Sequence, residues 1–312
     1  MFVGHGLVAF ALAAAAARSL GWSRERSLSV GVVAGLFGLA PDVDMAYALV
    51  GLVGAEGAMD AAAGFWSAST RVHRAVTHSF LVGGVAALAA GALAARGPVR
   101  LAGALVLCGL VAAAGLATGA LAVGVTALFV LAVAAIAALG VRLGFGPRAV
   151  AAAAAVGLLT HPPGDLLTGE PPAFLYPLDA TLVGARPEPF ADATLNLLAP
   201  LYLELATFWL ALVAYLWVAD GLPALGTHLR WRAALGLGFA GLAVVAPPPT
   251  LGVSYHFVFP LVGVGVVAAA PLPLVEATSL GDLRERPLAV VATGLAAVTL
   301  GAVAYTGTYL LL

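Results

Sequence analysis

The chain has 312 residues, of which 62% are hydrophobic and only 9% charged, and its mean hydropathy is +1.06. An ordinary soluble domain carries roughly 25% charged residues, so the composition excludes a typical soluble fold. The net charge is −1 and all fourteen cations are scattered arginines, which excludes a basic patch for nucleic acid. The single cysteine, Cys108, excludes a disulfide framework.

Ten apolar segments predict an all-α, polytopic integral membrane protein with about ten transmembrane helices, because ~20 apolar residues cross ~30 Å of hydrocarbon. The sixth and eighth segments are short, so broken or re-entrant helices are expected there. The first segment is expected to be a retained helix, since the arginines follow it, whereas a signal peptide begins with positive charge. The segments are 2–17, 28–53, 79–95, 101–118, 120–140, 149–165, 196–218, 233–247, 254–271 and 288–311.

The arginines predict an orientation in the cell membrane, because cytoplasmic loops carry an excess of cations. If the loops alternate, eleven of the fourteen arginines lie on one side and only Arg71, Arg74 and Arg186 on the other. Both termini then face away from the cytoplasm. The polar residues described next fall near the extracytoplasmic face.

Four short polar islands interrupt the apolar sequence: Gly4-His5, Pro41-Asp42-Val43-Asp44, the stretch from His73 to Ser79, and the stretch from His161 to Asp165. Ionisable groups at membrane depth are costly unless they pair, line a wet cavity or hold a metal. The predicted orientation places all four islands at about the same depth in the membrane. They are therefore expected to form one composite site.

The spacing within the islands leaves several geometries open. Asp42 and Asp44 are two apart and do not share a helix face, but both carboxylates can turn inward to one or two cations if the span is broken there. The alternative is a loop in which both acids face water. His161 and Asp165 are four apart, but Pro162 and Pro163 lie between them, so a shared face is not assured. His5 is either a ligand or an interfacial histidine.

The central island is dense in functional groups. His73 and His78 are five apart, which matches no common zinc motif. Arg74 could bind a substrate phosphate or carboxylate with both guanidinium nitrogens. Thr77 or Ser79 could orient a ligand or cap the third span. The alternative for this island is a solvated loop with ordinary histidines.

Imidazoles combined with carboxylates suit a divalent transition metal, with zinc as the first choice and manganese or iron as alternatives. One or two ions fit the number of ligands, and two are slightly favoured. The candidate catalytic residues are Asp44, Arg74 and Asp165: a spare aspartate would act as general base, and Arg74 would stabilise developing negative charge. The candidate metal ligands are His5, Asp42, Asp44, His73, His78, His161 and Asp165.

The order His5, Pro41-Asp42-x-Asp44, His73-Arg74-x-x-Thr77-His78-Ser79 and His161-x-x-x-Asp165-x-x-Thr168 resembles the membrane-bound metal-dependent hydrolase family, also called the YdjM-like or LexA-binding inner-membrane-associated hydrolases. The resemblance covers about residues 1–178. It implies a multi-spanning membrane protein with metal-dependent hydrolase activity and the same ligand positions.

The chain is expected to divide into a metal-site domain, 1–178, and a C-terminal transmembrane extension, 179–312, with a proline- and glycine-rich seam between them. The leading functional hypothesis is hydrolysis of a lipid-associated phosphoester or ester at the outer membrane face, so that membrane lipid and a lipid-linked substrate are the expected partners. The alternatives are a transporter for metal ions or small solutes, and a non-catalytic membrane protein with a structural metal.

Overall fold

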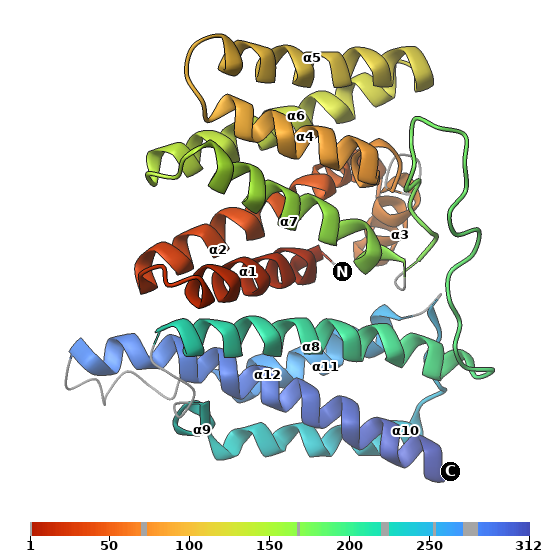
Figure 1. The fold of residues 1–312 in the computed structure, drawn as a ribbon. Coiled ribbons are helices and arrows are strands. Elements are labelled where there is room, and N and C mark those ends of the chain that lie inside the picture. Colours follow the sequence, from red (N-terminus) through yellow and green to blue (C-terminus); the bar gives the residue numbers. More distant parts are fainter. Residues whose placement is uncertain (1, 70–73, 167–168, 220–224, 252–253, 271–279) are drawn as a thin grey trace. The chain divides into compact units, whose positions relative to one another are not determined.

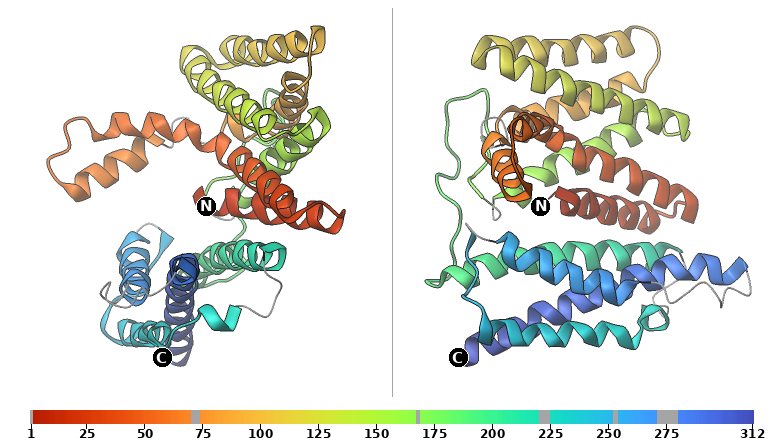
Figure 2. Two further views of the ribbon diagram at one scale, coloured as in Figure 1. Left: turned by 90° about the vertical axis from the view of Figure 1, so that its left-hand side faces the viewer. Right: turned by 180° about the vertical axis from the view of Figure 1, so that it is seen from behind.

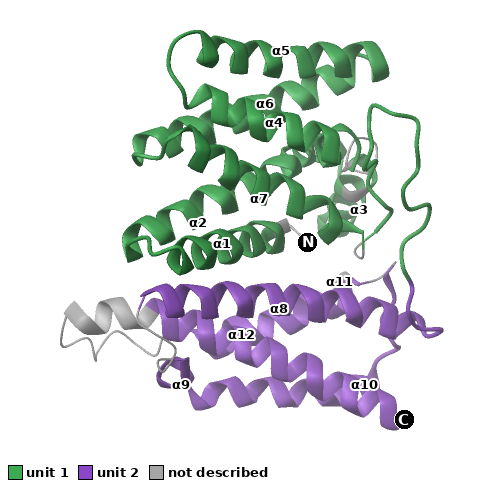
Figure 3. Cartoon of the chain, in the orientation of Figure 1, with its two compact units in different colours: residues 1–187 green, residues 188–312 purple. Residues whose placement is uncertain are grey.

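The computed structural model describes residues 2–69, 74–166, 169–219, 225–251, 254–270 and 280–312. Within these ranges the chain is all-α and contains no strand, as the sequence predicts (Figure 1). It divides into two compact units, residues 1–187 and 188–312 (Figure 3).

The first unit contains α1 to α7, joined by two 3-10 segments, η1 and η2. Helices α1, α2 and α7 pack against one another, α4 packs on α7, and α5 and α6 follow beyond α4 (Figure 1). Helix α3 and the part of η1 that pairs with it project away from the other helices of the unit (Figure 2), whereas η1 also contacts α6 and α2. The bounds are α1 Phe2–Ser19, α2 Arg24–Leu39, η1 Ala40–Leu52, α3 Ala58–Ser69, η2 Val76–His78, α4 Phe80–Leu93, α5 Pro98–Thr118, α6 Ala120–Arg142 and α7 Pro147–Asp165.

The second unit is built around α12, which contacts every other helical element that the structure describes in that unit. Its core contains Leu198, Phe257 and Tyr305, with the phenylalanine and tyrosine rings packed edge to face. The bounds are α8 Ala193–Ala219, α9 Leu225–His228, η4 Trp231–Gly241, α10 Leu242–Val245, α11 Tyr255–Ala269 and α12 Leu280–Leu311.

All ten predicted segments form helix, but only five helical stretches among the described residues are long and apolar enough to cross a membrane. A membrane protein is therefore supported, whereas the number of about ten spans is not confirmed. Helix α4, for example, has 14 residues, which at ~1.5 Å per residue is shorter than the hydrocarbon core. The five stretches are Arg24–Leu52, Pro98–Thr118, Ala120–Arg142, Ala193–Ala219 and Pro287–Leu311.

Glycines bring α1, α2 and α7 into close contact. A Cβ atom on Gly157 of α7 would lie 2.5 Å from the carbonyl oxygen of Ala34 and 2.6 Å from the backbone nitrogen of Gly38, both in α2. A Cβ on Gly38 would in turn lie 2.8 Å from the carbonyl oxygen of His5 in α1. Small residues at such positions let membrane helices approach backbone to backbone. This packing brings His5, Gly38 and His161 next to one another.

The polar islands, with Arg74 among them, lie at one end of this helix group, and the arginines that flank α1, α2 and α7 lie at the other. In α1, for example, His5 lies in the first turn and Arg18 in the last. Arg24 and Arg26 likewise begin α2, while Asp42 follows its end. Helix α4 starts beside His78, and α7 starts at Pro147 and ends at Asp165. The four islands therefore meet at one end, as the sequence predicts for their common level.

Candidate metal centre

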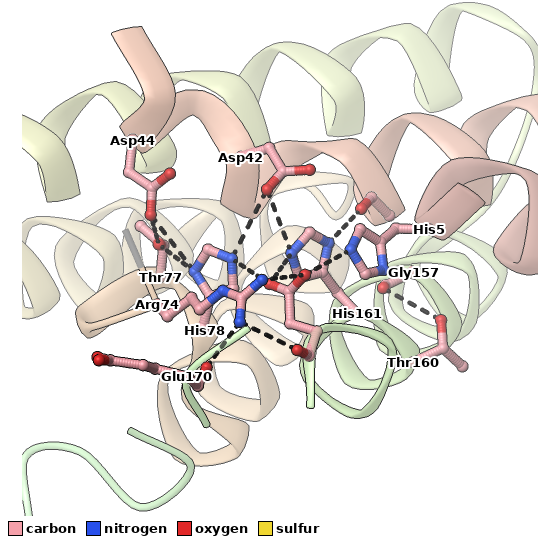
Figure 4. Close-up of polar contacts among 12 residues, drawn as sticks. His5, Asp42, Asp44, Arg74, Thr77, His78, Gly157, Thr160, His161 and Glu170 are labelled. Atoms are coloured by element: carbon pink, nitrogen blue, oxygen red, sulfur yellow. Dashed lines mark hydrogen bonds and ion pairs between the residues drawn. The ribbon is translucent and has the colours of Figure 1, made fainter. Parts of the chain in front are cut away.

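The side chains of two histidines and two aspartates lie close together at the end of the first unit where the polar islands meet. One ligand atom from each of Asp42, His78, His161 and Asp165 lies within 4.8 Å of the other three (Figure 4). The four residues come from η1, η2 and the last turn of α7. Three of their side chains are 0–2% exposed, and that of Asp42 is 11% exposed.

The four histidine–carboxylate distances in this group are close to those of a metal coordination shell. His78 Nε2 lies 3.1 Å from Asp165 Oδ2 and 3.7 Å from Asp42 Oδ1. His161 Nε2 lies 3.6 and 3.5 Å from the same two oxygens. Ligands ~2.0–2.2 Å from a tetrahedral metal are separated from each other by about 3.3–3.6 Å. The donor set fits a divalent transition metal, because imidazole and carboxylate suit zinc, iron and manganese.

A hydrogen bond to the Nδ1 atom of His161 orients its other ring nitrogen, Nε2, toward the cluster. Its Nδ1 lies 2.7 Å from the carbonyl oxygen of Gly38, which can only accept. The Nδ1–H therefore donates, and Nε2 of the neutral ring carries the lone pair. This buried nitrogen has no hydrogen-bond partner among the described residues. This nitrogen faces carboxylate oxygens at 3.5 and 3.6 Å, an arrangement that a cation between them stabilises, either a proton on Nε2 or a bound metal.

A second chain of hydrogen bonds orients His78. The Thr77 hydroxyl donates to Asp44 Oδ2 at 3.0 Å, so its oxygen accepts from His78 Nδ1 at 2.9 Å. Asp44 Oδ2 itself lies 3.4 Å from His78 Nδ1 (Figure 4). The Nε2 lone pair then faces Asp42 and Asp165. Metal-bound histidines commonly donate their other ring N–H to such a polar partner.

His5 and Arg74 hold Asp165 in place. His5 Nε2 lies 3.0 Å from Asp165 Oδ1, and Arg74 Nη2 lies 3.6 Å from the same oxygen. The Arg74 guanidinium also donates to the carbonyl oxygens of Asp165 and Glu170, at 3.1 and 2.7 Å. With Oδ1 engaged in this way, Oδ2 of Asp165 faces the two cluster histidines.

The backbone of Arg74 is also held in an unusual conformation. Its φ of 69° lies in the left-handed region, which costs a residue other than glycine of order 1–3 kcal/mol. The Arg74 carbonyl accepts from the amide of Ala173 at 2.9 Å. The chain that follows α7 thus returns to the central island and fixes the guanidinium beside Asp165.

The predicted site residues are thus placed in three groups. The first is the four-ligand group of Asp42, His78, His161 and Asp165. In the second group, His5 contacts Asp165 and Asp44 contacts His78. Arg74 borders the group at Asp165, and His73 and Thr168 lie outside the described residues.

The structure also resolves two geometries that the spacing left open. Helix α7 continues through Pro162 and Pro163, so that His161 and Asp165 share a face. The regular α-helix of the second span ends at Leu39, and a 3-10 segment carries Asp42 and Asp44. Ser79 caps α4 by accepting from the amides of Leu81 and Val82, as one of the two predictions for it had stated.

The role of the Gly38 carbonyl was missed, because a backbone acceptor leaves no signal in the residue types. Helix α3 was missed as well: its sequence falls between the second and third predicted segments, 28–53 and 79–95. The need for glycine at 164 was also not anticipated. A Cβ there would lie 2.6 Å from Cε1 of His5.

No family model, curated protein sequence or solved structure matches the chain. The resemblance to the membrane-bound metal-dependent hydrolases therefore depends on the four sequence motifs.

Thr77→Val is expected to weaken metal binding by about 10–100-fold, the usual effect of removing a group that orients a metal-bound histidine. Valine keeps the size of the side chain but cannot bridge Asp44 and His78. Isothermal titration calorimetry of the metal-free protein with zinc measures the change in affinity. Thr77→Ser keeps the hydroxyl and serves as the matched control, with affinity close to that of the unaltered chain. Equal affinities for the valine and serine variants would contradict the orienting role of Thr77.

Proposed function

We propose that the chain is an integral membrane, metal-dependent hydrolase whose single divalent transition metal is held by Asp42, His78, His161 and Asp165. The observation that carries the proposal is the four-atom group with coordination-shell spacing. The motif resemblance points to the same activity. Zinc is the first candidate, and manganese and iron suit the same donors.

The charges of the cluster favour one ion over two. Asp42, Asp44 and Asp165 contribute three carboxylates, and Arg74 contributes one guanidinium, so that two negative charges are in excess when the histidines are neutral. One divalent cation balances this excess. Balance matters here because uncompensated charge is costly in a buried, membrane-associated site.

A divalent metal held by these residues would supply hydroxide at neutral pH, because such an ion lowers the pKa of a bound water to about 7. Asp42 is the carboxylate best placed to accept a proton, since its buried Oδ2 has no hydrogen-bond partner among the described residues. Asp44 acts through His78, which it orients together with Thr77.

Arg74 determines the charge of the substrate that the site would accept. Its side chain is 14% exposed, and it places a guanidinium beside Asp165. A phosphoester or ester oxygen could contact it, and a lipid-linked substrate would reach a site at this depth from the bilayer. Asp42 and Arg74 are the two members of the cluster that solvent reaches.

The arginine distribution supports a site near the extracytoplasmic face of the cell membrane. His5 and Arg18 are thirteen residues apart in α1, which corresponds to ~20 Å along the helix. Arginines at the far end of α1 and at the starts of α2, α5 and α7 favour a cytoplasmic location for that end. The metal group then lies toward the opposite leaflet.

A structural metal is the main competing function, and one observation favours it. Four protein ligands complete a tetrahedral shell, whereas catalytic zinc sites commonly have three and an open position. Hydrolysis at this site therefore requires a fifth coordination position or the displacement of one carboxylate. Asp42 has the most exposed side chain of the four, so we expect it to be the carboxylate that is displaced.

Hydrolysis is tested with detergent-purified protein that has been stripped of metal and reloaded with zinc, manganese or iron(II). A panel of lipid phosphoesters and lipid esters is offered, and released product is measured. We expect cleavage that depends on the metal, and a loss of at least 10-fold in Arg74→Gln when excess metal in the assay keeps the bound ion near one per chain.

Two outcomes would contradict the proposal. A bound ion that raises the thermal transition without cleavage of any substrate in the panel would support the structural metal. Metal uptake into proteoliposomes that is lost in His78→Ala would support transport.

A further inference from the structure

A cavity of about 640 Å³ lies between α1, α2 and α7, at the arginine-rich end of the first unit. It is separate from the metal group, whose residues do not line it. Its walls are mainly apolar, and alanine is the most frequent residue in them. The alanines that line it are Ala13, Ala16, Ala17, Ala149, Ala152 and Ala153.

Arginine and tryptophan side chains border this cavity at one end. Arg26 and Arg148 both line it, as does Trp22, which precedes α2. The Arg26 guanidinium lies 4.9 Å from the centre of the Trp22 ring and 5.4 Å from that of Phe145. Arg18 donates to the Trp22 carbonyl oxygen at 3.1 Å. Arginine and tryptophan are typical of the membrane interface, where charged groups meet hydrocarbon.

The lining is almost entirely apolar, and its charged members are all basic. Among the described residues that line the cavity, two are arginines and none is acidic. The apolar walls extend from this charged end along α7 to Val156, eight residues beyond Arg148, which is ~12 Å of helix. An elongated apolar ligand with an anionic head matches this combination. Basic pockets between membrane helices on the cytoplasmic side bind anionic lipid headgroups.

We propose that the cavity between α1, α2 and α7 binds an anionic phospholipid, with the headgroup phosphate at Arg26 and Arg148 and an acyl chain along the alanine-lined wall. The site is distinct from the metal centre. Its occupancy does not depend on hydrolase activity.

The headgroup contact is tested by lipid retention. The protein is purified in mild detergent and incubated with vesicles of phosphatidylglycerol or of phosphatidylcholine, and bound lipid is quantified by mass spectrometry. The double variant Arg26→Gln/Arg148→Gln is expected to bind phosphatidylglycerol about 25-fold more weakly, since each arginine near an anionic lipid contributes a factor of about five. Arg96→Gln/Arg100→Gln removes two exposed arginines outside the cavity lining and is the matched control. Equal retention in the two double variants would overturn the proposal.

The acyl-chain contact is tested by filling the cavity. Ala152 is exposed and lines the cavity, so Ala152→Trp is expected to displace the lipid and leave the thermal transition in lipid-free detergent unchanged. Ala113→Trp on the exposed face of α5 is the matched control. Lipid retention that is as high in Ala152→Trp as in Ala113→Trp would overturn the placement of the acyl chain in the cavity.

Discussion

His161→Ala is expected to reduce bound metal from about one ion per chain to nearly none and to abolish metal-dependent cleavage. The substitution removes one of four ligands, and it also leaves the Gly38 carbonyl without its donor. The remaining two aspartates and one histidine would hold a divalent ion at least 100-fold more weakly, because loss of an orienting partner alone costs 10–100-fold. Elemental analysis of the detergent-purified variant measures the result.

His256→Ala provides the matched control, since His256 is exposed on α11 in the second unit and should leave the metal content unchanged. A second variant, Asp42→Asn, tests whether loss of metal results from misfolding, because asparagine keeps the shape of this partly exposed side chain. It should lower metal affinity at least 10-fold while the thermal transition of the metal-free protein stays the same. A stoichiometry near one ion per chain in His161→Ala would contradict the assigned ligand set.

Gly157→Ala is expected to destabilise the first unit by about 1–3 kcal/mol or more, the usual cost of overpacking a close contact. The added methyl group would meet backbone atoms of α2, which cannot rotate away as a flexible side chain would. Helices α2 and α7 would have to separate. Because Gly38 of α2 orients His161 of α7, metal affinity should fall together with stability.

The thermal transition of the metal-free protein measures this effect. Gly124→Ala is the control, because α6 leaves open space around Gly124. In a helix interior that change should be neutral or stabilising by up to about 1 kcal/mol. If both variants unfold at the same temperature, the close packing of α2 on α7 does not carry the stability assigned to it.

The apolar segments and the polar islands were visible in the sequence for simple physical reasons. Long apolar runs predict helices, and all ten predicted segments are helical. Ionisable residues in such runs require a partner or a ligand, which is why Asp42, His78, His161 and Asp165 stood out before their contacts were known. Their convergence at one level followed from alternating loops and the placement of arginines.

Other features depended on how helices pack, which residue types do not reveal. The continuation of α7 through Pro162 and Pro163 depends on its tertiary contacts, since proline removes a helical hydrogen bond and usually ends a helix. Helix α3, which contacts η1, was likewise not apparent from its local sequence.

The sequence by itself determined the class of this protein: an all-α, strongly apolar chain with imidazoles and carboxylates set in four islands. Only the tertiary structure decided which of those side chains come together in the ligand group and which contact the ligand residues instead. Asp42 and Asp44 illustrate the difference, since they are two residues apart, yet one joins the ligand group and the other contacts Thr77 and His78. The direction of a side chain depends on the local backbone and on neighbouring helices, and in this chain those neighbours come from α1, α2 and α7, far apart in sequence.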